Sequence, residues 1–140
     1  MRTLSLGLAV LAGMLVPSVA MSQDDIVGTL FGKATEIYKD KGYGPTGWEQ
    51  RGELDEGAET RLTVKLSAGT SFSIVGVCDL DCGNLDIRLL DIGGNEVTKD
   101  IQDDDFPIVN VTTAGTYTAR VIMVKCKSNP CAFGAKAFAE

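Results

Sequence analysis

The side chains with the most varied chemistry in this sequence are four cysteines, which occur as two close pairs. Cys78 and Cys82 enclose the stretch CDLDC, and Cys126 and Cys131 enclose CKSNPC. Pairs with this spacing could form disulfide bonds, a four-cysteine zinc site or a redox couple. The thioredoxin-like redox motif has two intervening residues and a βαβ setting, and neither is found here. The environment in which the chain folds decides among these alternatives.

Residues 1–20 have the three-part layout of a secretory signal peptide. Arg2 precedes an uncharged apolar run from Leu4 to Val16, and the small residues that follow indicate cleavage after Ala20. The run has about 13 residues, whereas a membrane-spanning helix needs about 20, so we expect no membrane insertion. An exported chain reaches an oxidising compartment. We therefore expect disulfide bonds and a secreted or periplasmic protein.

Four cysteines allow three disulfide connectivities, and their spacing alone does not choose among them. Geometry favours the two local bridges. The Asn129-Pro130 turn would place Cys126 opposite Cys131 at the end of a hairpin. A bridge from Cys78 to Cys82 would likewise close the corner between two strands. We expect each pair to staple a turn.

Acidic side chains surround the first cysteine pair and raise the question of a calcium site. Asp79, Asp81, Asn84 and Asp86 lie close together, and residues 103–105 form a second acidic cluster. Calcium takes about six to eight oxygen ligands, but this spacing lacks the glycine and the glutamate of the helix–loop–helix calcium loop. In the other interpretation, which we favour, these acids cap their own backbone at turns. We expect no cofactor, with calcium as the one candidate ion.

The sequence contains no histidine, which excludes Ser-His-Asp and Cys-His catalysis and hydrolysis by histidine-bound zinc. Cysteines held in disulfides supply no nucleophilic thiolate. A carboxylate pair of the glycosidase type remains as an alternative. Acids on turns are nevertheless ordinary in an acidic secreted domain, so we expect no enzymatic activity.

Three aromatic residues, Tyr43, Trp48 and Phe106, fall in turn or connector segments. Rigid amphipathic rings often anchor sugars or peptides, so these residues form the candidate binding surface. In the alternative interpretation, Tyr43 and Trp48 only cover the end of the domain where an N-terminal helix joins it.

Apolar residues recur at helical spacing from Asp24 to Lys41, and Gly42 ends the pattern. We expect this helix to pack its apolar stripe against the rest of the chain. After a Gly- and Pro-rich connector from Tyr43 to Trp48, the period changes to two, which is typical of half-buried strands. The expected strands are residues 49–54, 61–66, 71–77, 85–89, 96–100, 107–112, 117–123 and 132–139.

Short strands separated by turn sequences at even spacing predict an all-β fold, an antiparallel β-sandwich of about eight strands with one N-terminal α-helix after the signal peptide. We divide the chain into the signal peptide (1–20), the helix with its connector (21–48) and the sandwich (49–140). The formal net charge of −6 would repel nucleic acid, so we expect no nucleic-acid partner. We also expect a monomer.

Three stretches follow the order of features of a known family: LSAGTSFSIVG, NLDIRLLDIGGNEV and DDDFPIVNVTTAGTYTARVIMV. Through them, Leu54 to Ala139 resembles the bacterial pre-peptidase C-terminal domain, a small β-sandwich found beside secreted peptidases. The resemblance implies a jelly-roll-like sandwich that sometimes binds calcium and that attaches to insoluble substrates or assists secretion. Asp86 and Asp91 match the family's pattern best as calcium ligands, and their alternative role is to fix strand ends. The sequence contains no peptidase and adds two cysteine pairs, so it resembles a stand-alone exported variant.

These features lead to an expected function. We expect an exported, non-catalytic β-sandwich that binds an extracellular polymer or a protein partner through an end surface that includes the acidic corner. The alternative is a structural or envelope protein that acts through protein–protein contacts, with helix residues such as Phe31 as the contact surface. A weak enzyme that uses carboxylates is the third alternative.

Overall fold

A computed structural model of the chain describes Gly13, residues 25–67 and residues 69–140. The expected signal peptide, apart from Gly13, and the first residue of the expected helix lie outside these residues. Among the helical residues that are described, none belongs to a helix long and apolar enough to cross a membrane.

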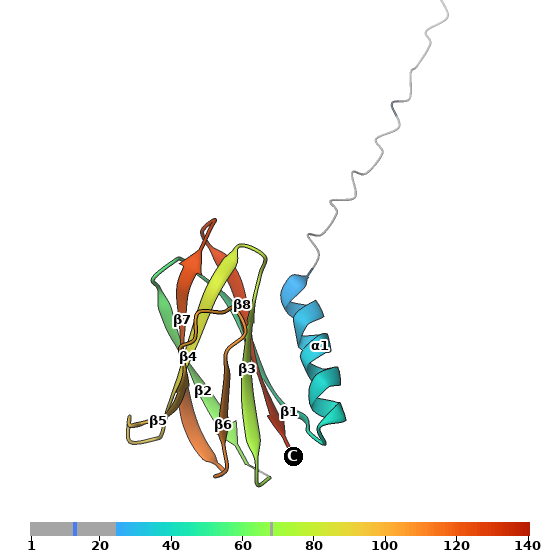
Figure 1. The fold of residues 1–140 in the computed structure, drawn as a ribbon, viewed down its shortest axis with the longest axis vertical. Coiled ribbons are helices and arrows are strands. Elements are labelled where there is room, and N and C mark those ends of the chain that lie inside the picture. Colours follow the sequence, from blue (N-terminus) through green and yellow to red (C-terminus); the bar gives the residue numbers. More distant parts are fainter. Residues whose placement is uncertain (1–12, 14–24, 68) are drawn as a thin grey trace, which may run out of the picture.

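The described residues form one helix and eight strands (Figure 1). Their bounds are α1 Ile26–Asp40, β1 Gly44–Leu54, β2 Glu59–Leu66, β3 Phe72–Cys78, β4 Cys82–Leu90, β5 Glu96–Asp100, β6 Ile108–Val111, β7 Gly115–Cys126 and β8 Cys131–Ala139. The expected helix and the expected eight strands are therefore confirmed, with ends that differ by a few residues.

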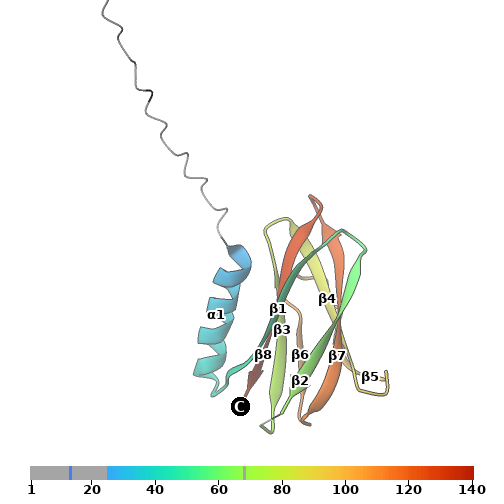
Figure 2. The same cartoon turned by 180° about the vertical axis from the view of Figure 1, so that it is seen from behind.

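The strands form two four-stranded antiparallel sheets, one with the order β1-β8-β3-β6 (sheet A) and one with the order β2-β7-β4-β5 (sheet B). The chain forms one long hairpin with four antiparallel pairs: β1–β8, β2–β7, β3–β6 and β4–β5. The hairpin is rolled up, so that successive pairs fall in alternate sheets. Figures 1 and 2 show the two layers from opposite sides. This arrangement is a jelly roll, as expected.

Apolar side chains fill the space between the sheets, because inward-facing residues alternate with outward-facing ones along each strand. Phe72 of β3, Leu85 and Ile87 of β4 and Met123 of β7 are among the largest side chains that are fully buried. Each of them stabilises the fold by about 1.5–3 kcal/mol relative to an exposed position. Three aromatic residues on inward-facing strand positions, Phe72, Tyr117 and Phe133, are also buried.

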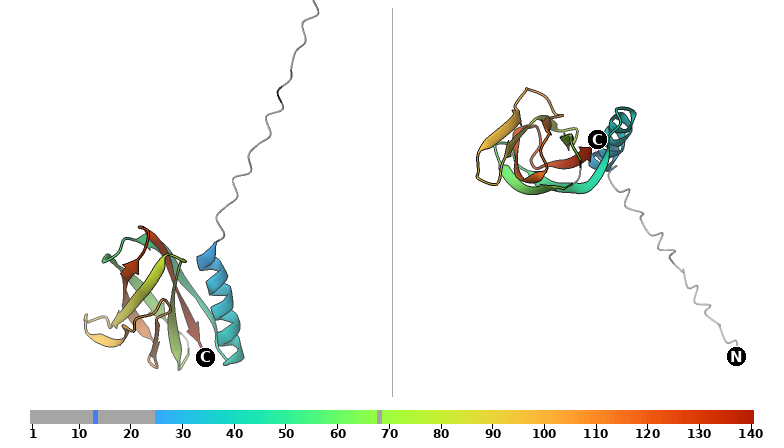
Figure 3. Two further views of the ribbon diagram at one scale, coloured as in Figure 1. Left: turned by 45° about the horizontal axis from the view of Figure 1, so that its top comes forward. Right: turned by 90° about the horizontal axis from the view of Figure 1, so that it is seen from below.

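Helix α1 lies along the outer face of sheet A and forms a second, smaller core with it (Figure 3). The carboxylate of Asp25 caps the helix by accepting a hydrogen bond from the N–H of Gly28 at 2.9 Å. The ring of Tyr38 stacks on that of Phe138 in β8, with 4.5 Å between the ring centroids. The buried stripe of the helix consists of Val27, Phe31, Ala34 and Tyr38. The expected packing of this stripe against the sandwich is confirmed.

The helix covers the outer face of sheet A, and no helix covers the outer face of sheet B in the described part of the chain. All seven residues of β3 are buried, because one side of this strand meets sheet B and the other side meets α1. The helix contacts β1, β3 and β8, which are all strands of sheet A. The outer face of sheet B carries no helix in the described part of the chain, as Figure 3 shows.

Two expectations about local conformation are wrong. The expected connector from Tyr43 to Trp48 is largely strand, because β1 begins at Gly44 and pairs with the end of β8. Pro45 is tolerated there since β1 is an edge strand, and the register shifts between Pro45 and Glu49. The Asn129-Pro130 turn, which has a cis peptide bond, does not close a hairpin. It crosses from β7 in sheet B to β8 in sheet A, because each strand already has partners in its own sheet.

Candidate functional site

Both expected local disulfides are present, one from Cys78 to Cys82 and one from Cys126 to Cys131, each with 5.9 Å between the Cα atoms. Each bridge joins the last residue of a strand in one sheet to the first residue of a strand in the other. Cys82 and Cys126 are opposite each other in the β4–β7 ladder, so both bridges lie at one end of the sandwich, the disulfide end. All four cysteines are used in this way, which excludes a four-cysteine zinc site and leaves no cysteine thiolate as a nucleophile. Two disulfides fit an oxidising environment.

Asp79 and Asp81 brace the disulfide end. The carboxylate of Asp79 accepts hydrogen bonds from the backbone N–H groups of Asp81 at 3.1 Å and of Ala132 at 2.8 Å. The backbone N–H of Asp79 also donates to the carbonyl of Ala132, and that of Lys127 donates to the carbonyl of Asp81. These bonds tie the corner between β3 and β4 to the corner between β7 and β8. The carboxylate of Asp79 thus caps turn backbone as the non-metal interpretation proposes, whereas Asp81 takes part through its backbone groups.

Asn84 and Asp86 lie further along β4, and in the described chain they carry the buried side-chain oxygens that lack a hydrogen-bond partner. Asn84 is only 6% exposed, and its Oδ1 atom has no hydrogen-bond partner in the protein. The Oδ1 atom of Asp86 is likewise buried and unpartnered. Burial raises the pKa of Asp86, and the nearby Arg88 guanidinium lowers it. Three further acids, Asp100, Asp104 and Asp103, raise it again.

Asp91 lies at the other end of β4, in the turn to β5. Its Oδ1 atom accepts hydrogen bonds from the backbone N–H groups of Gly93 and Asn95, each at 2.9 Å. The five candidate calcium ligands thus fall in three places: the disulfide corner, the middle of β4 and the β4–β5 turn. Over residues 25–67 and 69–140, no three carboxylates or thiolates converge in a way that could hold a metal ion.

The three candidate aromatic residues are half-buried and pack in different places. Tyr43 contacts the ring of Tyr38 edge-on, and its hydroxyl shares a hydrogen bond of 2.7 Å with Ser71. The indole N–H of Trp48 donates to the carbonyl of Thr63 at 3.0 Å, and its ring packs against the core between the sheets. Phe106 packs against the core under the helix. The structure therefore does not gather the three rings into one platform.

A pocket of about 460 Å³ lies between the start of α1 and the disulfide end. Its lining combines carboxylates with apolar side chains: Asp25, Ile26, Val27, Asp79, Leu80, Asp81 and Ala132. Asp25 is already engaged, because hydrogen bonds from Arg51 and from the N–H of Gly28 lower its pKa. The backbone hydrogen bonds described above engage Asp79. Among the residues that line the pocket, Leu80 is the apolar side chain most open to a partner, at 86% exposed.

A row of four cations crosses the outer face of sheet B. Arg61 of β2 is opposite Arg120 of β7, Arg120 is opposite Arg88 of β4, and Arg88 is opposite Lys99 of β5. The neighbouring residues Ala119 and Leu89 are fully buried in the core, so by strand alternation the four cations point outward. We call these four residues the basic row.

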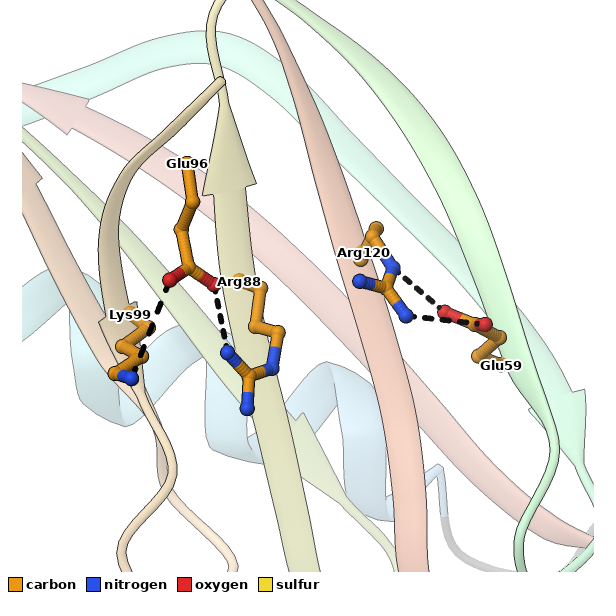
Figure 4. A network of polar contacts seen from close by, with 5 residues as sticks. All are labelled: Glu59, Arg88, Glu96, Lys99 and Arg120. Atoms are coloured by element: carbon orange, nitrogen blue, oxygen red, sulfur yellow. Dashed lines mark hydrogen bonds and ion pairs between the residues drawn. The ribbon is translucent and has the colours of Figure 1, made fainter. Parts of the chain in front are cut away.

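Two carboxylates partly neutralise the basic row (Figure 4). Glu59 accepts from Nε of Arg120 at 2.8 Å and from its Nη2 at 3.2 Å. Glu96 lies 2.8 Å from Nη1 of Arg88 and 4.0 Å from Nζ of Lys99. Hydrogen bonds from these arginines lower the pKa of Glu59 and Glu96. Arg61 takes part in none of the ion pairs formed among the described residues.

Comparison with known proteins does not extend these observations. No family model matches the chain, and a search of curated proteins gave no significant match. The relation to the pre-peptidase C-terminal domain therefore rests on the resemblance of the three sequence stretches alone.

Proposed function

We propose that this protein is an exported, non-catalytic β-sandwich module that binds an extracellular polymer through the outer face of sheet B. The leader-like residues 1–20 and the two disulfides support export. The lack of histidine and the bridging of every cysteine support a binding role over catalysis. Several acids that could have served as catalytic carboxylates are engaged with backbone N–H groups, as at Asp79 and Asp91.

One observation carries the choice of surface. The helix covers sheet A, whereas the outer face of sheet B is open and displays the basic row in a protein with a net charge of −6. The outer face of a four-stranded sheet suits a polymer better than a small molecule, which would need a concave site. The face therefore replaces the end loops and the acidic corner as the surface we assign to binding.

The alternative of a structural or envelope protein relied on α1 as the contact surface. Phe31 is 3% exposed and belongs to the core under the helix, so it is not available to a partner. Ile37 is the large apolar side chain of α1 that is open to solvent, at 50% exposed. A single exposed side chain of this kind is ordinary on a protein surface. The polymer-binding function is therefore the better supported of the two.

Retention on insoluble polymers tests the function. Purified protein would be mixed with collagen and with neutral and acidic polysaccharide particles, and the bound fraction would be measured after washing. We expect retention on at least one polymer. Thr118→Trp places a bulky ring on the outer face of sheet B and should abolish retention, whereas Thr29→Trp on the exposed side of α1 should not.

The results distinguish failure of the proposed function from a wrong choice of binding surface. If no polymer retains the parent protein, the proposed function is wrong. If both tryptophan variants bind like the parent, the outer face of sheet B is not the binding surface. Circular dichroism of each variant would establish that it is folded.

A further inference from the structure

We infer that the ligand of the outer face of sheet B is a linear anionic polysaccharide, whose carboxylate or sulfate groups are bound by the basic row. This inference rests on the proposed function and names its ligand class. It follows from four properties of the row: its cost to the fold, its arginine content, its geometry and the lack of aromatic side chains around it.

The row is a costly arrangement for a β-sheet. Like charges directly opposite each other on neighbouring strands destabilise a sheet, and here three such contacts follow one another from Arg61 to Lys99. Glu59 and Glu96 offset part of this repulsion, and Asp86, two residues before Arg88 on the same face of β4, offsets a further part, so three carboxylates face four cations. Groups of residues that destabilise a fold are expected mainly at functional sites. A bound polyanion would supply the missing negative charges.

Arginine dominates the row. Among the described residues, three of the four arginines lie in it, and only Arg51 lies elsewhere. The planar guanidinium group matches carboxylate and sulfate oxygens with paired N–H donors, which a lysine cannot do. Glu59 engages Nε and Nη2 of Arg120, and Glu96 engages Nη1 of Arg88. The other guanidinium N–H groups take no part in these ion pairs and can meet a ligand.

The geometry of the row fits a chain that runs across the strands. Neighbouring strands are about 4.8 Å apart, so four side chains in register extend over about 14 Å. The side chains of Arg120, Arg88 and Lys99 are 29%, 31% and 46% exposed, so they are held near the surface but remain accessible. Thr63 and Thr118, which are opposite each other, lie on the same outer face two residues along their strands. Their hydroxyl groups can hydrogen-bond to sugar hydroxyls.

The side chains around the basic row favour a polysaccharide over nucleic acid. Proteins that bind single-stranded nucleic acid stack its bases on aromatic side chains. Neither the four cations nor the residues that flank them on the outer face, Thr63 with Thr118 and Glu59 with Ile122, are aromatic. We therefore assign the face to a polysaccharide and treat an oligonucleotide as a competing ligand in the test.

The test measures affinity for four soluble probes: polygalacturonate, sulfated dextran, unmodified dextran and a single-stranded oligonucleotide. We expect the parent protein to bind one or both acidic polysaccharides, with affinity that falls as salt is raised. Arg61→Glu reverses a charge without breaking an ion pair of the described chain, and we expect it to weaken binding about tenfold. Lys33→Glu makes the same change on the exposed side of α1 and should leave binding within about twofold.

A third variant should increase the affinity for the acidic polysaccharide. Glu96→Gln removes the carboxylate that competes for Arg88 and Lys99, so we expect binding to become about two- to fivefold tighter. A merely structural role for these ion pairs predicts no gain in affinity.

Several results would overturn the inference. These are equal binding of unmodified dextran, tighter binding of the oligonucleotide, or equal effects of Arg61→Glu and Lys33→Glu. Retention of the parent on a neutral polymer, lost in Thr118→Trp but kept in Arg61→Glu, would reject the anionic ligand and leave the proposed function standing. Failure to bind any of the soluble and insoluble polymers would reject both.

Discussion

The carboxylate of Asp91 holds the turn between β4 and β5 by accepting two backbone hydrogen bonds. We predict that Asp91→Ala lowers the free energy of unfolding by about 1–2 kcal/mol, since a charged acceptor of backbone N–H groups is lost. Asp91→Asn keeps one acceptor oxygen and should cost less than half as much. Urea denaturation of the three proteins would measure both changes.

The same variant tests the role implied by the family resemblance. If Asp91 acted as a calcium ligand, the loss in Asp91→Ala would appear when calcium is present and vanish when a chelator is added. Because its oxygen already serves Gly93 and Asn95, we expect an equal loss in both conditions.

Asp86 gives a prediction with a defined pH dependence. Burial raises the pKa of its carboxyl group above the ordinary value of 3.8, so the folded state favours the protonated form. The stability that this protonated group contributes is fully present below pH 3.8 and is lost as the pH rises through the raised pKa. We predict that Asp86→Asn, which cannot ionise, is more stable than the parent at pH 7 and that the gain shrinks as the pH falls.

Denaturation midpoints measured between pH 4 and pH 8 would show this convergence. Asp81→Asn serves as the control, because Asp81 is exposed and the same negative charge is removed. A gain of equal size in both variants would mean that net charge, and not the burial of Asp86, is responsible.

The docking of α1 depends on a glycine in the strand beneath it. A Cβ atom at Gly134 of β8 would lie 2.5 Å from the ring of Phe31 and 2.7 Å from a methyl group of Val27, so these side chains or the helix that carries them would have to shift. We predict that Gly134→Ala lowers the free energy of unfolding by about 1–3 kcal/mol through overpacking. Gly32 of α1 has no atom near its own Cβ position, so Gly32→Ala should instead stabilise the protein by about 0.5–1 kcal/mol. Chemical denaturation of both variants would decide, and a neutral Gly134→Ala would mean that the helix is loosely held.

Most elements of this fold could be predicted from the sequence because their signals are local. The sequence predicts the strand at residues 96–100 with the observed ends and the helix with ends within about two residues. It does not predict a strand from Gly44 to Trp48, since the Gly- and Pro-rich composition resembles a turn and only pairing with β8 makes this segment a strand. β3 shows no alternation of burial because the helix covers its outer side.

The basic row could not be predicted in the same way. Its four members are spread from Arg61 to Lys99 and Arg120, and each one taken singly is an ordinary outward-facing residue of an alternating strand. They become neighbours only through the order β2-β7-β4-β5 and its register. A register shift of one residue would move each cation to the other face. The disulfides, in contrast, join residues close in sequence, and their pairing was within reach of local geometry.

The whole molecule is held differently at its two ends. At the disulfide end, both bridges cross between sheet A and sheet B, and the bonds of Asp79 and Asp81 link one corner to the other. At the opposite end, the connection from β4 to β5 is a turn held by the hydrogen bonds of Asp91. This arrangement makes the two bridges parts of one clamp, because each holds the corner on which the other corner's hydrogen bonds depend.

A double-mutant cycle tests this clamp. Replacing Cys78 and Cys82 by serine, or Cys126 and Cys131 by serine, should each lower the free energy of unfolding by about 2 kcal/mol, because a short crosslink is lost from the unfolded chain. Removing both bridges should cost less than the sum by at least about 0.5 kcal/mol, since the first loss already loosens the corner-to-corner hydrogen bonds. Denaturant titrations of the four proteins give the coupling energy directly.

Strict additivity of the two losses in free energy of unfolding would show that the two corners are independent. Hydrogen exchange of the Ala132 and Lys127 amides, which donate across the corners, should then be unchanged by loss of the bridge between Cys78 and Cys82, whereas a shared clamp requires it to become faster.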